Sequence, residues 1–552
     1  MGHDGTFNIT DPRFRRSDYV PTDTERSKLT EILKQETINI ECFNEELLRH
    51  AEDTVVIQRK SSETTASTCR SALSAHRRLP TEVWDIVFST LCLALHQYTF
   101  QIEYIDEETF PALRTPAFIL SQVCSRWRAI VSNSPRLWSS YSIDVDSTAH
   151  IPDISSLLGL YFANAGDYPP SVRIARDRES PALSEGESVT WEVLLQYLPR
   201  CKELSLRIDG YALVDFSGIS FPNLECFCTE LDMSGSNTEN EIQFWNPIRA
   251  APNLRKVTLW QLPDFGGLPF HQLTELDLHL IDGFDVDVVL EHLPSCKSLE
   301  RLSFWGLDDY HLSDLMDVGR VDVPLSLTTL SIHDAAEWVR LEHQPGDQNF
   351  NLTTLLTSLY IPSLVSLDLS CREWPSLLLT MVARSPLLEK VTLTIRRPPQ
   401  TDTVSAYPVI SIMRSLPRLT HFELRMGPMR TQTHTHLGRD ILSTVLSSLV
   451  VDPSPTSPKL EHLSFRLSDI TLDSELIEGV LERIQTVMES SRPRPLKGFS
   501  LYRIYTKDSP EVEFELEDAL RERMWDLERR FGFGMVVGEC DWKDYLLRGC
   551  FL

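Results

Sequence analysis

The sequence predicts an α/β fold: an irregular solenoid, shaped as a horseshoe with a parallel sheet, preceded by an all-helical N-terminal module. Three observations lead to this prediction. A short motif of the form L-x-x-L-x-L recurs over most of the chain, and apolar helical stretches separate its copies. The N-terminal part shows helix-start signals instead of this motif. The length of 552 residues also exceeds what a single core usually supports.

The repeated motif usually has proline two residues before it. Its clear copies begin at Leu254, Leu273, Leu299, Leu327, Leu364, Leu388, Leu419, Leu460 and Leu496, with 19 to 41 residues between successive starts. Weaker copies begin at Cys201 and Leu224. Alternation inside the motif indicates a short strand with two inward Leu-like residues.

Helical stretches lie between copies of the motif. Examples are residues 190–199, 284–294 and 376–386. Since one strand–turn–helix unit cannot bury its own apolar edge, neighbouring units stack into a curved parallel sheet. This is the signature of leucine-rich repeats, and we assign residues 139–540 to such a solenoid. The asparagine that usually follows the strand is mostly replaced, so irregular turns are expected.

Further elements are predicted at both ends of the solenoid. Strands near 139–145 and 170–175, with a helix around 152–164 between them, extend the array toward the N-terminus. A helix over 513–532 and a strand over 534–538 are expected to close the other end as a cap.

The terminal regions have a different character. Residues 1–21 are polar and are expected to form a disordered tail, and residues 541–552 a C-terminal tail. Thr22 and Glu25 form a capping box, and a helix follows that packs on its own protein or serves as a coiled-coil partner site. The Ser/Thr-rich run 59–74 favours a linker or frayed helix. Residues 22–75 are therefore assigned to an N-terminal helix and linker.

Residues 76–138 contain further motifs in a defined order. L-P-x-E-[VI]-x-x-x-[IV]-[FL] begins at Leu79, and V-C-x-x-W-R-x-[IL] begins at Val123. P-x-L-W follows and ends at Trp138. A helix is predicted to begin with Thr115 as its cap and Pro116 in its first turn.

Together these motifs resemble the F-box, and the chain is similar to F-box proteins of mushroom-forming fungi. It departs from the family pattern by an insertion near 92–115, where the family commonly has only a few residues between two helices. The resemblance implies a substrate-recognition subunit of a Skp–cullin–F-box ubiquitin ligase. The box would dock on a Skp-type adaptor, and through it a cullin, while the repeats bind an unidentified target protein. The adaptor-binding residues that it implies are Leu79, Pro80, Val83, Ile86, Val123, Trp127, Leu137 and Trp138.

A candidate target-binding stripe follows from the repeat register. The residue just after the last Leu-like position of the motif should lie on the concave face of the sheet. In four successive copies this residue is Trp260, His279, Trp305 and His333. Aromatic residues are enriched in binding hot spots, so the stripe would contact either the target or a covering segment of the chain itself.

Two other functions stay open. One is a leucine-rich-repeat interaction scaffold with a degenerate box, which the long insertion favours. The other is a hydrolase, which needs a convergent polar pocket. No G-x-S-x-G, P-loop or G-x-G-x-x-G motif occurs, so we expect no catalytic site and no cofactor.

Isolated pairs of metal-ligand residue types also occur. The H-x-H pair of His434 and His436 has no third ligand nearby, and Asp285 and Asp287 fit a solvated helix start. We therefore predict no metal site.

Charge and composition restrict the partners. The net charge of −26 repels phosphate backbones and argues against nucleic-acid binding. Apolar stretches are too short to span a bilayer, and no secretory signal is recognised, so no membrane partner is expected. The eleven cysteines are scattered and include no C-x-x-C pair, as in a reducing compartment. We expect a cytoplasmic and/or nuclear protein.

Overall fold

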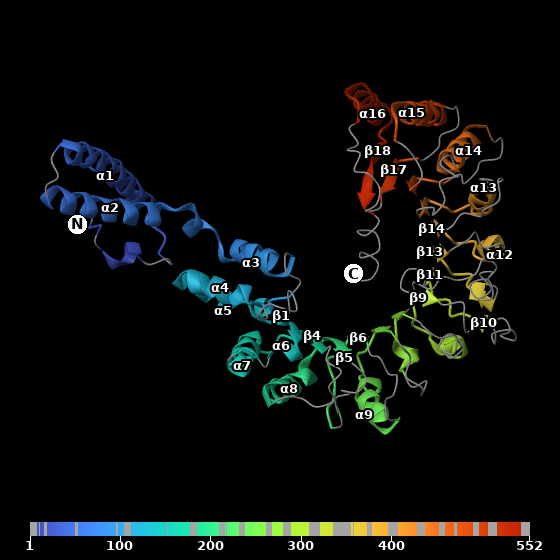
Figure 1. Ribbon diagram of the computed structural model, residues 1–552, viewed down its shortest axis with the longest axis horizontal. Coiled ribbons are helices and arrows are strands. Elements are labelled where there is room, and N and C mark those ends of the chain that lie inside the picture. The colour runs from blue at the N-terminus through green and yellow to red at the C-terminus, as the bar shows by residue number, and fades with distance from the viewer. Residues whose placement is uncertain are drawn as a thin grey trace, which may run out of the picture. The chain divides into compact units, whose positions relative to one another are not determined.

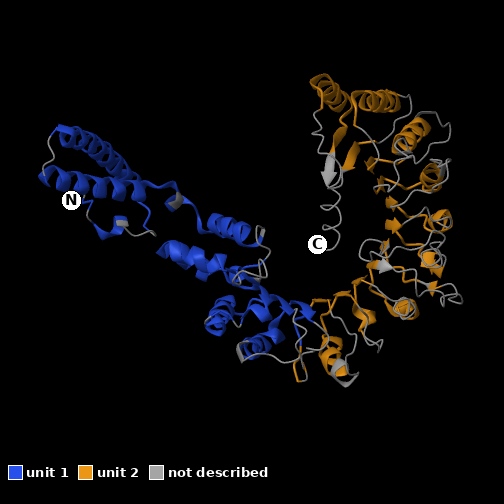
Figure 2. Ribbon diagram, in the orientation of Figure 1, with its two compact units in different colours: residues 1–212, 221–224 blue, residues 213–220, 225–552 orange. Residues whose placement is uncertain are grey.

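The fold is an α/β architecture with a largely parallel sheet of 16 strands that follows an N-terminal pair of helices, as the predicted solenoid requires (Figure 1). The computed structural model describes residues 8–9, 11–15, 19–49, 53–94, 98–103, 112–148, 150–151, 153–176, 185–208, 216, 218–230, 238–260, 268–279, 289–307, 321–334, 355–356, 358–371, 378–395, 407–427, 437–451, 459–468, 472–489, 496–505 and 516–541. The chain divides into two compact units, residues 1–212 with 221–224 and residues 213–220 with 225–552 (Figure 2). Our division at 138/139 between box and solenoid stays a prediction.

The first unit begins with a helical hairpin of α1 (Asp23–Arg49) and α2 (Asp53–Leu73). The expectation of a linker or frayed helix over 59–74 is corrected here, since most of that run lies in α2. Its threonine hydroxyls donate to backbone carbonyls four residues earlier, so they need no solvent partner. The small residues Ala66, Cys69 and Ala72 are buried, which allows the two helices to approach closely.

The described part of the N-terminal region is ordered around the hairpin. A 3₁₀ turn, η1 (Pro12–Arg15), places the ring of Phe14 in a cluster with Leu29, Cys69 and Ala72. The expected capping box is present, because Glu25 accepts from the amide of Thr22 and the Thr22 hydroxyl accepts from the amide of Glu25. The prediction of a disordered tail over 1–21 is therefore corrected for these described residues.

The box segment contains short helices. They are η2 (Ala75–Arg78), α3 (Thr81–Ser89), the π-helical turn η3 (Thr90–Ala94), α4 (Pro116–Val123), α5 (Ser125–Ser132) and the 3₁₀ turn η4 (Pro135–Trp138). Thr115 precedes α4, and Pro116 lies in its first turn, as predicted. Helices α4 and α5 are separated at Cys124, whose backbone is extended, with φ −160° and ψ 166°.

The insertion contributes strands, so the expectation of an all-helical module is corrected. Strand β1 (Phe100–Glu103) pairs antiparallel with β2 (Ala112–Arg114) and parallel with β3 (Ser140–Asp144). Phe100 and Ile102 are fully buried, and this alternation is the reason that the segment forms a strand.

The remainder of the first unit alternates strands and helices. After β3 come α6 (Val145–Thr148), α7 (Ile154–Ala165), β4 (Ser171–Arg176), α8 (Glu185–Tyr197), η5 (Leu198–Arg200) and β5 (Glu203–Ile208). Strands β3, β4 and β5 pair in parallel. The predicted strands near 139–145 and 170–175 and the helix around 152–164 are confirmed.

The second unit continues the same alternation. Its strands in the large sheet are β6 (Cys226–Thr229), β7 (Lys256–Leu259), β8 (Glu275–His279), β9 (Arg301–Leu307), β11 (Thr329–Asp334), β13 (Ser366–Cys371), β14 (Lys390–Ile395), β15 (His421–Met426), β16 (His462–Leu467), β17 (Gly498–Tyr505) and β18 (Gly534–Asp541). They pair in parallel and in register, so that Val257 faces Leu276 and Leu276 faces Leu302. A separate pair joins β10 (Val321–Asp322) and β12 (Leu359–Tyr360). The first leucine of each clear copy of the motif is buried, which confirms the repeat register.

The helices of the second unit flank one face of the sheet (Figure 2). They are α9 (Thr238–Arg249), η7 (Phe270–Gln272), η8 (Leu293–Ser295), α12 (Leu378–Ala383), α13 (Tyr407–Ser415), α14 (Leu437–Val451), α15 (Ser474–Glu489) and α16 (Asp518–Phe531). Strand β18 follows α16 as the last strand of the sheet, as the predicted cap requires. Among the described helices, none combines the length and apolar character that a membrane crossing requires.

Candidate functional site

An aromatic cluster holds the box helices together. Trp84 and Phe88 lie four residues apart on α3 and face Trp127 of α5. The ring centroids of Trp84 and Phe88 lie 5.0 Å each from that of Trp127. This inward face leaves the opposite face of α3 without cover from these rings.

Polar contacts fix the same helices. Arg126 of α5 donates from its two terminal nitrogens to the carbonyl oxygens of Arg77 and Leu79, each at 2.6 Å. The Ser134 hydroxyl donates to Oδ1 of Asp85 at 2.6 Å. The start of α3 is thereby tied to α5, although the two segments are far apart in the sequence.

The structure separates the eight predicted adaptor-binding residues into two groups. Leu137 and Trp138 are buried, at 0% and 2% exposure. The indole of Trp138 donates to the carbonyl of Val131 at 2.8 Å and contacts the ring of Tyr161. Trp127 is half-buried in the aromatic cluster. Leu137 and Trp138 therefore pack inside the protein, and a partner cannot reach them without unfolding this segment.

The other five lie at the surface. We use the term apolar surface for the exposed aliphatic residues of α3, η3, α4 and the residues just before α3: Leu79, Pro80, Val83, Ile86, Val87, Leu91, Ile119 and Val123. Ile86, Ile119 and Val123 are the most open, at 65%, 62% and 56% exposure. Both α3 and α4 pack against α5, which holds the two parts of the apolar surface on one small module. Such a concentration of exposed aliphatic side chains makes this module a candidate interaction site.

The predicted target-binding residues form a continuous stack in the second unit. Trp260 follows β7, and His279, Trp305 and His333 lie on β8, β9 and β11. Ring centroids are 4.8 Å apart for Trp260 and His279, 5.8 Å for His279 and Trp305, and 3.9 Å for Trp305 and His333. The planes deviate by 11° or less from parallel. We call this row the aromatic ladder.

The aromatic ladder is only partly accessible. Trp260, His279 and Trp305 are half-buried, and His333 is buried. Burial lowers the pKa of His279 to about 4, so its imidazole is neutral at pH 7. Nε2 of His333 lies 3.9 Å from Oδ2 of Asp368, and burial raises the pKa of that carboxyl to about 6. The two indoles and His279 of the ladder are thus uncharged at pH 7.

Beyond two small buried residues, Ser370 and Thr394, the same row becomes basic. Glu423 forms ion pairs with both arginines: its Oε1 lies 2.8 Å from Nε of Arg425 and 2.7 Å from Nε of Arg466. The guanidinium of Arg466 also lies over the ring of Tyr502, 5.2 Å from its centroid. Arg466 and Tyr502 were not among the predicted site residues, but they occupy the ladder position in the last two copies of the motif, and this signal would have identified them.

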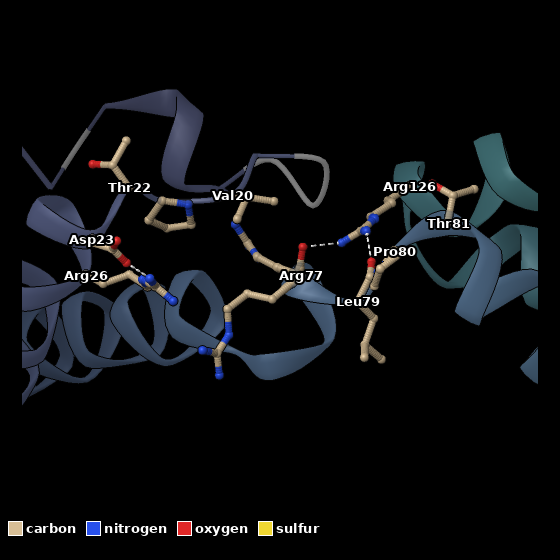
Figure 3. A pocket seen from close by; sticks show the side chains of 11 residues that line it. Val20, Thr22, Asp23, Arg26, Arg77, Leu79, Pro80, Thr81 and Arg126 are labelled. Carbon is tan, nitrogen blue, oxygen red and sulfur yellow. Dashed lines mark hydrogen bonds and ion pairs between the residues drawn. The ribbon is translucent and has the colours of Figure 1, made fainter.

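A groove in the first unit was not anticipated from the sequence. It has a volume of about 650 Å³ and is lined by residues from three separate segments (Figure 3). These are Val20–Asp23 with Arg26, then Arg77–Thr81, and then Arg126. Only the tertiary packing of the hairpin beside the box helices brings them together.

The remaining candidates from the sequence are pairs of potential metal ligands. In the described part of the chain, no group of three His, Cys, Asp or Glu residues could hold a metal ion. His434, His436, Asp285 and Asp287 lie outside the described residues.

Comparisons with known proteins identify no family. No protein-family model and no curated protein sequence matches the chain. Among solved structures, the chain is similar to a Bacteroides fragilis protein that was a structural-genomics target, with 16% identity over 51% of this chain. The match spans 65% of that protein's length, with a TM-score of 0.29, a likeness too distant to support an argument about fold or function.

Proposed function

We propose that the protein is the substrate-recognition subunit of a Skp–cullin–F-box ubiquitin ligase. The observation that carries this proposal is the apolar surface on α3 and α4. It lies in the segment that resembles the F-box, and it contains Leu79, Pro80, Val83, Ile86 and Val123 of the implied adaptor-binding set. Membership of the F-box family is part of the proposal.

In this function the apolar surface docks on a Skp-type adaptor. Burial of apolar surface contributes about 25 cal/mol per Å², so covering several exposed aliphatic side chains supplies a large part of a binding free energy. The adaptor in turn joins a cullin, and catalysis belongs to these partner subunits. The contribution of this chain is proximity, because it raises the concentration of the target near the ubiquitin donor.

The target is proposed to bind the helix-free face of the sheet in the second unit. The aromatic ladder offers the indole rings that are enriched in binding hot spots. Arg425 and Arg466 follow on the same face and offer guanidinium donors. A target with an apolar part and an acidic part would match this face.

The alternative of a scaffold with a degenerate box rests on the long insertion. Strands β1 and β2 of the insertion join the sheet, while α3 still packs against α5 through Trp84, Phe88 and Trp127. This arrangement favours a box that is intact in spite of its insertion.

Adaptor binding tests the proposal. The double variant Ile86→Asp, Val123→Asp places charges on the apolar surface, and its affinity for a Skp-type adaptor should fall at least about a hundredfold, since each aliphatic side chain contributes roughly 1.5–3 kcal/mol when buried. Calorimetric titration of full-length protein measures the effect. Ile57→Asp on α2 is the matched control, because Ile57 is 68% exposed and lies outside the apolar surface.

The control should bind the adaptor as the wild type does, and all three proteins should melt at the same temperature. Equal adaptor affinity for the double variant and the wild type would rule out the apolar surface as the docking site. Absence of binding by the wild type itself would favour the scaffold.

A further inference from the structure

The groove of the first unit has a charge opposite to that of the whole chain. Four arginines line it, Arg26, Arg77, Arg78 and Arg126, together with one carboxylate, Asp23. The chain as a whole has 79 acidic and 53 basic residues, so it carries an excess of negative charge. A groove that concentrates guanidinium groups on such a protein focuses a local positive potential.

Two of these arginines are held in fixed positions. Arg77 is buried and donates to the carbonyl oxygens of Phe14 and Tyr19, each at 3.3 Å, and to the Ser71 hydroxyl at 2.8 Å. Arg126 donates to the carbonyl oxygens of Arg77 and Leu79, as Figure 3 shows. The walls are therefore built by side chains that hold the hairpin and the box helices together, and the groove does not depend on a ligand for its form.

The other two arginines are closer to solvent. Arg26 forms an ion pair with Asp23, whose side chain is 88% exposed. Arg78 is exposed, and no carboxylate among the described residues forms an ion pair with it. An incoming anion could therefore contact Arg78 without first displacing a described partner.

The form of the groove indicates the kind of ligand. Small-molecule sites are mostly apolar and enclose most of their ligand. This groove is open and is lined largely by charged and polar side chains, as an extended acidic segment of a protein would require. The groove is also continuous with the apolar surface, because Leu79 and Pro80 belong to both.

We infer that this groove binds an acidic segment of the same adaptor that docks on the apolar surface. This inference rests on the proposed function and adds the chemistry of the partner: an apolar docking face next to a run of carboxylates. The groove would act mainly on the association rate, because long-range attraction between opposite charges steers the encounter.

Charge reversal at one position tests the inference. Arg78→Glu should slow association with a Skp-type adaptor about tenfold at low salt, and the difference from wild type should shrink as salt screens the charges. Arg70→Glu is the matched control, because it changes the net charge by the same amount. Arg70 is exposed on α2 and does not line the groove. Stopped-flow association rates of the full chain at several salt concentrations provide the readout.

Competition identifies the ligand. A hexaglutamate peptide should slow adaptor association with the wild type and have little effect on Arg78→Glu. Equal association rates for Arg78→Glu and Arg70→Glu at every salt concentration would overturn the inference but leave the proposed function standing. Competition by inorganic phosphate without competition by the peptide would also overturn it, in favour of a small-anion site. A wild type that binds no adaptor would overturn both.

Discussion

The apolar surface on α3 and α4 and the aromatic ladder on β7 to β11 are both candidate binding sites, but they are built in opposite ways. On α3 and α4 the side chains point away from the core, and Ile86 and Val123 are more than half exposed. On the sheet each ring has a neighbouring ring, and His333 is buried. The first site therefore makes few internal contacts, whereas the second forms part of the fold.

This difference predicts how each site responds to mutation. A side chain that contacts only solvent contributes little to folding, so its replacement should affect binding alone. A stacked ring contributes to the stability of the sheet as well as to any interface, so its replacement should change both. A stability measurement alongside each binding measurement separates the two cases.

The largest expected effect is a loss of stability at the core of the sheet, and the other predicted losses are compared with it. Leu276 on β8 is 1% exposed and lies in register with Val257 and Leu302. Leu276→Ala should lower the free energy of unfolding by roughly 2–5 kcal/mol, by loss of buried apolar area and formation of a cavity. Chemical denaturation measures it.

Ile86→Ala on the apolar surface is the matched comparison. It removes a similar volume of aliphatic side chain, and it should change the unfolding free energy by less than about 0.5 kcal/mol. Similar losses for the two variants would contradict either the burial of Leu276 or the exposure of Ile86.

A smaller effect is expected at the aromatic ladder. Trp305 stacks on His279 and His333 and is half-buried. Trp305→Ala should cost about 2–3 kcal/mol of stability, from lost stacking and apolar contact, and should reduce the set of proteins that co-purify with the chain when the proteasome is inhibited. Trp525→Ala on α16 is the control, because Trp525 is 55% exposed and lies away from the ladder.

The measurements of stability and of protein capture together determine the role of the aromatic ladder. Lost stability with unchanged capture would make it a structural element alone. Unchanged values in both measurements would show that the ladder has neither role.

Much of the sheet and of both sites could be predicted from local pattern. The period of two within each L-x-x-L-x-L motif fixes which residues face the core, so the ladder position followed directly from Leu259 and Leu278. Ile86 was predicted as a docking residue from the resemblance of residues 79–138 to the F-box. At the ladder positions a single strand, with its regular geometry, determines which way the side chain points.

What could not be predicted depends on contacts between distant segments. The run 59–74 forms a helix because Cys69 and Ala72 pack on α1 and on Phe14, which its Ser/Thr-rich composition does not reveal. The burial of Leu137 and Trp138 depends on the neighbouring Tyr161 and on the packing of the module. The arginine groove likewise requires three separate segments to meet.

The last prediction concerns the pH dependence of stability, which we expect to arise at the aromatic ladder. Burial lowers the pKa of His279 to about 4, below its ordinary value of 6.5, because the charged imidazolium loses hydration in the ladder. A lowered pKa in the folded state means that the unfolded chain binds the proton more readily, so this contribution to stability is complete above pH 6.5 and is lost as pH falls toward 4. The loss should be about 1–2 kcal/mol at pH 4, after allowance for partial exposure of the ring.

The variant His279→Phe keeps a planar ring and removes the titrating group, so the difference in unfolding free energy between it and the wild type isolates this contribution. Asp277 on the same strand and Asp368 near His333 have pKa values raised by burial, which gives them the opposite pH dependence. Both remain in the variant and cancel in the difference. The gap between the two proteins should widen in favour of His279→Phe from pH 6.5 to 4. A constant gap would mean that His279 gains its charge without cost, and that the ladder is open to water instead of packed as a stack.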